Sequence, residues 1–364
     1  MVILHASPVG WRSVDWSLVV CACVALVLFL PIFDEALIGS RAQFEAARER
    51  DASTGIAWGL RALQEAPLAA LALAFAAWGW RERRRVDVRA PWRIRIAALQ
   101  FATGVWVCWL ALHLDLHPAL TWTSSLVIGA AGAVAWLLVS IVIELRFRAI
   151  WPQKLAALVD LFECRARAPG VAEAVLRGTS IGLVLLATEF LLILSASGRS
   201  SVRLDPLNHI VIVSQFFLSN AMPALHVAII AVYQALLVTL AIALAIPLLV
   251  ARVRPTSLAL VAGVIVLPLL IQNPAVAMGA VQPYGWKLLF LLVHSALLLL
   301  TFLWFDLLTV AVAVFTYGFW WGNHAILLAA PPDTTVTTWP AYGLWAAGVL
   351  AFGVIGFRQQ RHVQ

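Results

Sequence analysis

The sequence predicts an all-α fold: a polytopic bundle of transmembrane helices, about ten in number, with both termini in the cytoplasm. The composition is the first observation, because 63% of the 364 residues are hydrophobic and only 12% are charged. A soluble domain is about 45–50% apolar and roughly 25% charged, so this chain has too few charged side chains to cover a water-facing surface. A soluble globular enzyme, a disordered chain, a collagen-like chain and a disulfide-framework protein are therefore excluded.

Recurring apolar runs are the second observation. A helix needs about 20 mostly apolar residues to cross the ~30 Å hydrocarbon core of a bilayer. By that rule the whole chain, 1–364, is a single integral membrane domain. We expect its spans at 15–35, 62–80, 96–116, 121–144, 177–197, 224–250, 256–273, 286–304, 307–329 and 339–357.

The placement of the basic residues is the third observation, and it sets the orientation. If the N-terminus is cytoplasmic and all ten spans cross, eighteen of the 25 lysines and arginines lie in cytoplasmic segments and seven lie outside. Basic residues near the ends of spans favour the cytoplasmic side. The bias predicts that both termini are cytoplasmic.

Three of the longer connecting segments differ in character. Residues 40–61 pair Glu45 with basic neighbours at helical spacing, which predicts a short solvated helix in an extracytoplasmic loop. Residues 81–95 form a basic cytoplasmic loop. Residues 198–223 begin polar and become apolar from Ile210, which is typical of an extracytoplasmic or re-entrant segment.

The fourth long segment, the cytoplasmic loop 145–177, contains the pattern of an amphipathic helix. Pro152 suits a first helical position, and Lys154 lies mostly on the polar side. The apolar residues that follow at helical spacing are Leu155, Leu158, Val159 and Phe162. This pattern predicts a helix on the inner membrane surface, ended by the Pro169–Gly170 break.

The basic loop and the amphipathic helix are candidates for contact with anionic lipid headgroups or with a protein partner. The residues of this expected contact surface are Arg81, Arg83, Arg84, Arg85, Arg89, Lys154, Leu155, Leu158, Val159 and Phe162.

One carboxylate is expected deep inside the bilayer, where an ionisable group is costly and therefore a functional candidate. Glu189 lies about 12 residues into the fifth span, with Thr188 beside it. One interpretation places both residues on a solute or proton path. The other is an interhelical hydrogen bond that holds the bundle together, with the carboxyl protonated.

A metal site and a helix cap are two further candidates. The HLDLH run at the outer end of the third span places His113 and His117 on one helix face, as in metal-binding histidine pairs. No third ligand is evident in the sequence, and Pro118 ends the helix there, so polar residues close to water are the alternative. Asp306, in the short inner turn between the eighth and ninth spans, is expected to cap the ninth helix.

The sequence lacks the motifs of most other functional classes. The sequence has no phosphate-binding glycine loop and no HExxH pair, and the EExxxR motif of CAAX-type intramembrane proteases is absent. The net charge of +7 comes without a nucleic-acid recognition motif. We therefore expect no nucleic-acid partner and no cofactor.

One stretch resembles a known family. Residues 143–182 (IELRFRAIWPQKLAALVDLFECRARAPGVAEAVLRGTSIG) resemble a recurrent segment in the C-terminal membrane region of certain bacterial serine/threonine protein kinases. In those proteins a span ends in an acidic-then-basic stretch with a tryptophan–proline pair, and an amphipathic helix, a proline-containing break and the next span follow. The tail is also similar, through Pro332, Asp333, Trp339 and the closing span 342–357.

The resemblance extends over roughly residues 136–364. The kinase glycine loop, HRD and DFG motifs are absent, so kinase activity is not carried over. The resemblance implies a free-standing module of the bacterial cytoplasmic membrane that acts as a sensor or scaffold, and it transfers no active-site residue.

Three hypotheses of function remain. The first is a non-enzymatic inner-membrane protein that serves as a sensor, a scaffold or a membrane subunit of a larger complex, with partners at its cytoplasmic face. The second is a transporter or permease subunit with a path near Glu189. An intramembrane enzyme is the third, and no nucleophile–base pair supports it.

Overall fold

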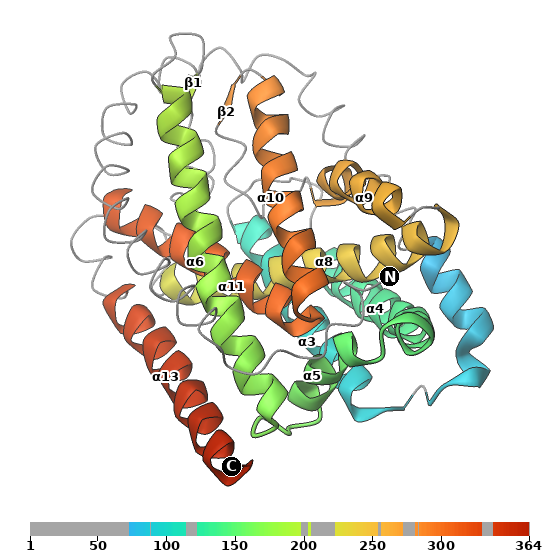
Figure 1. Cartoon of the computed structure of the whole chain (residues 1–364). Helices are drawn as coiled ribbons and strands as arrows, with labels where there is room; N and C mark the ends of the chain where they lie inside the picture. Colours follow the sequence, from blue (N-terminus) through green and yellow to red (C-terminus); the bar gives the residue numbers. More distant parts are fainter. Residues whose placement is uncertain are drawn as a thin grey trace.

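The computed structural model of the chain (Figure 1) describes residues 73–87, 89–113, 122–197, 203–204, 223–253, 256–271, 281–282, 284–329 and 338–363. The expected first span, the extracytoplasmic loop 40–61, His117 and the larger part of 198–223 lie outside these residues.

The described residues are almost entirely helical, which confirms the all-α class. The helices are η2 (Arg83–Arg85, a 3₁₀ turn), α3 (Pro91–His113), α4 (Trp122–Ile150), α5 (Gln153–Phe162), α6 (Pro169–Ser197), α8 (Pro223–Arg252), α9 (Thr256–Ile271), α10 (Tyr284–Trp304), α11 (Leu307–Ala329) and α13 (Thr338–Val363). Two-residue strands, β1 (Arg203–Leu204) and β2 (Val281–Gln282), pair antiparallel.

Helices occupy the third to the tenth expected spans, and residues 73–82, which include the described part of the second, are also helical. The bounds of α11 agree with the expected 307–329, whereas α6 begins at Pro169 rather than at 177. Four stretches of the described helices are long and apolar enough to cross a membrane. They are Ser125–Phe147, Gly170–Glu189, Pro223–Val250 and Thr338–Ile355, and Leu289–Trp304 is a shorter apolar helix.

Helix α13 shows most directly that the surface suits lipid. Its side chains include Leu344, which is 76% exposed, and Leu350, which is 69% exposed. Large apolar side chains exposed along a whole helix are unfavourable in water, and the hydrocarbon core of a bilayer removes that cost.

The two ends of the bundle differ. At one end of the bundle, α5 contacts both α3 and α10. Arg95, near the start of α3, donates to the carbonyl of Phe162 at 2.6 Å. Lys154 of α5 donates to the carbonyl of Leu303, near the end of α10, at 2.7 Å. We call this the α5 end. The β1–β2 pair lies at the opposite end, and α6 and α10 run between the two (Figure 1).

Helices α6 and α11 pack closely against each other. A Cβ atom at Gly178 would lie 2.7 Å from the carbonyl oxygen of Thr309, and one at Gly182 would lie 2.6 Å from that of Ala313. Small residues four apart on one helix face allow two membrane helices to approach backbone to backbone. The two glycines therefore determine how closely α6 and α11 pack.

The amphipathic helix expected in 145–177 is present as α5, but it ends earlier than expected. Cys164 has a φ of 63°, the N–H of Arg165 donates to the carbonyl of Asp160, and that of Cys164 donates to the carbonyl of Leu161. This Schellman pattern ends a helix by itself. The Pro169–Gly170 pair, expected to be the break, instead begins α6, because proline suits the first helical turn.

Candidate functional site

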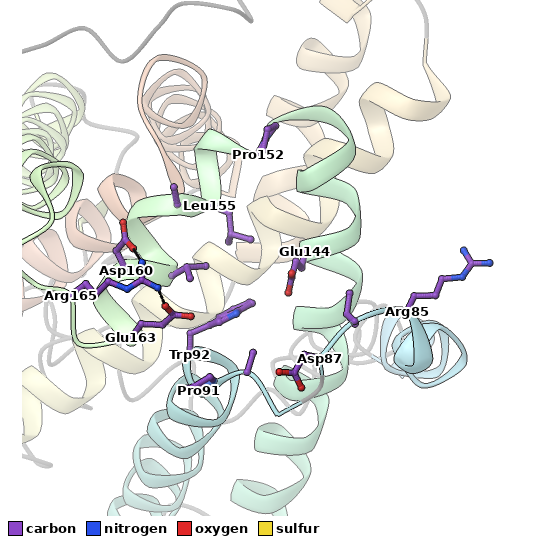
Figure 2. Close-up of a pocket in the computed structure, with 14 residues that line it drawn as sticks. Arg85, Asp87, Pro91, Trp92, Glu144, Pro152, Leu155, Asp160, Glu163 and Arg165 are labelled. Carbon is purple, nitrogen blue, oxygen red and sulfur yellow. Dashed lines mark hydrogen bonds and ion pairs between the residues drawn. The ribbon is translucent and has the colours of Figure 1, made fainter.

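A cavity of about 640 Å³ opens at the α5 end, between η2, the start of α3, the end of α4 and α5. Cavities of roughly 300–1,000 Å³ are the usual size of ligand sites. Trp92, Leu155 and Val159 give the cavity an apolar floor, and Ala156 is an exposed residue at its edge. Figure 2 shows Trp92 between the two groups of charged side chains described next.

The charges that line the cavity are mostly acidic. Asp160 and Glu163 lie together on one side, held by ion pairs to Arg165, of which the Asp160 pair measures 3.3 Å. Asp87 lies across the cavity from them (Figure 2). Glu144 also lines the cavity, but the buried Arg93 balances its charge. Asp87, Asp160 and Glu163 together exceed the single positive charge of Arg165, which favours an incoming cation over an incoming anion.

Most arginines of the segment 81–89 are exposed. Arg81, Arg84, Arg85 and Arg89 are exposed, and Arg83 stacks over the ring of Trp80 at 3.8 Å. Arg85 forms an ion pair with Glu82 at 3.0 Å, and in Figure 2 its side chain points away from the cavity. These arginines are therefore accessible from solvent or from a headgroup layer.

A fully buried ion pair forms the base of the cavity. Arg93, 0% exposed, pairs with Glu144 of α4, which is 5% exposed. Two charges leave water only when their mutual attraction and hydrogen bonds offset the cost of desolvation. The pair connects the first turn of α3 to the last turns of α4, which are the two helices that support the cavity.

Lys154 was expected on the solvated side of α5, and this expectation is wrong. Its side chain is buried, and its ammonium donates to the carbonyls of Phe302 at 3.0 Å, of Leu303 at 2.7 Å and of Phe305. The last carbonyls of a helix lack partners within it, and a cation there also complements the helix dipole. Lys154 thus caps the C-terminus of α10, and α5 is fixed to the bundle.

Burial changes the charges of this cap. It lowers the pKa of Lys154 to about 8, and the nearby Asp306 carboxylate partly offsets the decrease. It raises the pKa of Asp306, while hydrogen bonds from Thr309 and the positive charges of Lys154 and Arg177 act in the opposite direction. The expected role of Asp306 is confirmed, because its Oδ1 accepts the backbone N–H of Thr309 at 2.8 Å, which is an N-cap bond of α11.

The apolar face of α5 packs against the protein rather than against a membrane surface. Leu155 is 5% exposed and Leu158 is 3% exposed, and both belong to the main core, which Val159 and Phe162 also contact. Leu155 and Leu158 are therefore buried against the bundle rather than against lipid, whereas Val159 and Phe162 are only partly buried. The spacing of the apolar residues was right, but the bundle itself covers them.

The Glu189 carboxylate is buried where α6 meets α11. Glu189 is 1% exposed and accepts a hydrogen bond from the hydroxyl of Tyr317. The ring of Tyr317 packs edge-on against His294 of α10, with centroids 5.1 Å apart. Thr188 bonds back to the carbonyl of Val184 in its own helix at 2.8 Å, so the structure does not bring it together with Glu189.

No family model, curated protein or solved structure matches this chain.

The expected metal site lies at the edge of the described residues. His113 is the last residue of α3 and His117 lies beyond the described part of that segment. Within the described residues no group of three or more histidine, cysteine or carboxylate side chains could hold a metal ion.

One sequence pattern resembles a catalytic motif but has another structural role. Residues 178–182 (GTSIG) fit the G-x-S-x-G spacing of hydrolases, whose serine stands on a strand-to-helix turn. Here the run lies within α6, and the hydroxyl of Ser180 donates to the carbonyl of Leu176 in the same helix at 3.1 Å. Ser180 is therefore not placed as a nucleophile.

Sequence reasoning missed three groups that shape these sites. The Arg93–Glu144 pair joins residues far apart in the chain, and the cap formed by Lys154 joins α5 to residues 148 or more positions later. Tyr317 and His294 lie on different helices from Glu189. The signal available was the presence of polar residues within apolar spans, which identifies candidates but not their partners.

Proposed function

We propose that this chain is a non-enzymatic multi-pass protein of the bacterial cytoplasmic membrane that serves as a scaffold, sensor or membrane subunit of a larger complex. In this proposal the cavity at the α5 end receives a basic segment of a protein partner. The observation that carries the proposal is the cavity itself, which is large, open and lined by an excess of carboxylates.

The construction of the cavity favours a docking role. The Arg93–Glu144 pair and the Lys154 cap hold its walls in place before any partner arrives. A preformed site loses less conformational entropy on binding than a flexible one. Acidic side chains on opposite sides would clamp a lysine or arginine, and Trp92 offers an apolar surface for its methylene groups.

The topology proposed with this function has ten spans and both termini in the cytoplasm. In it the 81–95 loop, the 145–177 loop and the turn at Asp306 all lie inside. The contacts that gather these three segments at the α5 end support it. The pairing of β1 with β2 supports it as well, because the proposal places both of their segments outside.

The exposed arginines of the segment 81–89 have a separate role in the proposal. Arg81, Arg84 and Arg89 would meet anionic lipid headgroups, each contributing about 1 kcal/mol near a negatively charged surface. Held at that surface, the cavity faces the cytoplasm next to the membrane. A partner with a basic juxtamembrane segment fits that position.

Photo-crosslinking in living cells tests the docking role. A photoreactive amino acid replaces Ala156, an exposed residue that lines the cavity, or Gln153, an exposed residue of the same helix that does not. We expect a discrete protein adduct from position 156 and none from position 153. Identical adducts at both positions, or none at 156, would count against a specific docking cavity.

A charge variant makes the test specific. Asp87→Asn removes a carboxylate but keeps an oxygen that can accept the N–H of Arg89, which Asp87 binds at 2.9 Å. The loop therefore keeps its shape while the cavity loses one negative charge. We expect the adduct from position 156 to weaken by up to about fivefold, because Asp87 is exposed and a contact with an exposed charge contributes about 0.2–1 kcal/mol. An undiminished adduct would exclude a basic ligand at Asp87.

A transporter subunit is the second candidate, and the buried bond between Tyr317 and Glu189 is the observation that favours it. An intramembrane enzyme has no comparable support among the described residues.

A further inference from the structure

The Glu189 carboxyl lies in surroundings that favour a neutral group. It is 1% exposed, on a stretch of α6 apolar enough to cross a membrane. Among the described residues no cation forms an ion pair with it, and its partner is the hydroxyl of Tyr317. An isolated buried carboxylate is very unfavourable, and a bound proton removes the charge.

A second group that can bind a proton lies beside it. His294 of α10 is 4% exposed and packs edge-on against the ring of Tyr317. Neither of its ring nitrogens makes a hydrogen bond to a described side chain. A backbone hydrogen bond at Phe290, one turn earlier in α10, is available to the ring, and an imidazole can both accept and release a proton.

Other polar groups on the surrounding helices complete the setting. Thr316, next to Tyr317, has a buried hydroxyl without a hydrogen-bond partner among the described residues. Among the described residues, titratable or charged groups on the elements packed against α6 include His324 on α11, Tyr342 and Arg358 on α13, and Lys154 and Asp160 on α5, besides Arg177 and Glu173 on α6 itself. None of them forms an ion pair with Glu189.

We propose that Glu189, Tyr317 and His294 form an exchangeable proton-binding site inside the membrane. Glu189 carries the proton, Tyr317 positions the carboxyl by its hydrogen bond, and His294 is the nearby base. On release, the O–H bond of the carboxyl breaks, a water molecule carries the proton, and an N–H bond forms on His294, leaving a carboxylate that still accepts from Tyr317 and an imidazolium. The return transfer restores two neutral groups. This site is separate from the docking cavity and does not depend on it.

Infrared spectroscopy of the purified full chain in lipid nanodiscs tests the proposal. We expect a carbonyl band of a protonated carboxylic acid at neutral pH, which disappears in Glu189→Gln. Glutamine has nearly the shape of the protonated side chain, so this variant keeps the bundle intact. Thr188→Val is the matched control, because the Thr188 hydroxyl bonds within its own helix, and its band should be unchanged.

Exchange in heavy water separates a functional site from a structural hydrogen bond. The band should move to lower frequency when the protein is transferred to D2O, because an exchangeable O–H becomes O–D. In His294→Phe, which keeps an aromatic ring against Tyr317, the exchange should slow on the order of 100-fold. This value is the lower end of the range that a positioned general base contributes to proton transfer. A merely structural histidine would leave the exchange rate unchanged, and that result would overturn the role of His294.

Two other outcomes would overturn the site as a whole. One is the absence of any carboxylic acid band that depends on Glu189, and the other is a band in the native protein that does not shift in D2O. If Glu189→Gln fails to fold, Tyr317→Phe replaces it. The band should then move to higher frequency because its carbonyl loses a hydrogen bond, and an unmoved band would contradict the assignment.

Discussion

Arg93 and Glu144 illustrate how much a single residue can matter in this bundle. Both side chains are buried and they neutralise each other. Arg93→Met or Glu144→Leu alone would leave a buried charge without its partner. We expect each single variant to lose about 3–5 kcal/mol of unfolding free energy, measured by thermal unfolding in detergent followed by circular dichroism.

The double variant Arg93→Met/Glu144→Leu separates pairing from burial. Replacing a buried ion pair with apolar residues of similar volume is often neutral or stabilising. We therefore expect it to recover most of the stability lost in either single variant. Additive losses would mean that the two charges stabilise the fold through separate contacts.

Lys154 gives the stability of the protein a specific dependence on pH. The pKa of its ammonium is lowered to about 8 in the folded chain, from 10.5 in an exposed lysine, because burial disfavours the charge. Between about pH 8 and 10.5 the unfolded chain therefore holds a proton that the folded chain has released. Stability rises with pH wherever the unfolded state binds more protons, so this lysine makes the folded state relatively more stable across that window.

Comparison with Lys154→Met isolates the effect, because the other titrating groups are common to both proteins. The melting temperature of the native protein should rise relative to that of the variant between pH 8 and 10.5, as measured in detergent at constant ionic strength. A constant difference between the two would show that Lys154 keeps its ordinary pKa in the folded chain. Burial lowers the pKa of Lys154, and the Asp306 carboxylate partly offsets this decrease.

At the scale of elements, the contact between α6 and α11 depends on the absence of two side chains. A Cβ at Gly182 would meet the backbone carbonyl of Ala313 at 2.6 Å, and backbone cannot yield as a flexible side chain can. We expect Gly182→Ala to force the helices apart and to cost about 1–3 kcal/mol of unfolding free energy.

A glycine in open space provides the control. A Cβ at Gly348 of α13 would have nothing within 4 Å. Gly348→Ala should leave stability unchanged or raise it by up to about 1 kcal/mol, because alanine favours a helix more than glycine does. Equal losses in both variants would mean that the effect arises from the helix itself rather than from the packing of α6 on α11.

Helix α5 shows where reasoning from the sequence succeeds and where it stops. The spacing of Leu155, Leu158 and Phe162 predicted a helix with one apolar face, and the helix is present. The spacing of apolar residues indicates that a helix has an apolar face, but it does not indicate what packs against that face. We assigned the face to the membrane surface, and this was wrong because the bundle covers it. The same limit applies to Lys154, whose acceptors lie 148 residues or more further along the chain.

The candidate sites likewise include residues that local sequence features predicted and residues that only the packing of distant helices brings together. Glu189 stood out because a carboxylate in an apolar span is rare, and Asp306 because a short turn before a helix needs a cap. Both expectations were local, and both residues make hydrogen bonds at the places that the sequence indicated. Tyr317, His294 and the Arg93–Glu144 pair depend on how distant helices pack, which a single sequence does not specify.

At the scale of the whole molecule, the proposed topology can be tested through the exposed thiol of Cys164. In a chain whose other three cysteines are replaced by alanine, Cys164 is the single target for a membrane-impermeant maleimide. We expect labelling in inside-out vesicles and none in intact spheroplasts, because the α5 end faces the cytoplasm in the proposal. Labelling from the outside would invert the topology.

The opposite end of the bundle supplies the complementary measurement. Arg203→Cys, in a chain that lacks the four native cysteines, introduces a thiol in β1. This thiol should react in intact spheroplasts and not in sealed inside-out vesicles. If the thiols at positions 164 and 203 react from the same side of the membrane, the chain between them crosses it an even number of times. That result would contradict the single crossing that we propose for this segment.

The cap formed by Lys154 also affects how the protein is made. A ribosome adds about 5–20 residues each second, so the 148 residues between Lys154 and Phe302 take roughly 7 to 30 s to synthesise. During that interval α5 has no fixed attachment at the end of α10, and one wall of the cavity is incomplete. A chain cut short before α10 would therefore insert its early helices without presenting a finished docking surface, so partners would be recruited only by chains whose synthesis has passed that point.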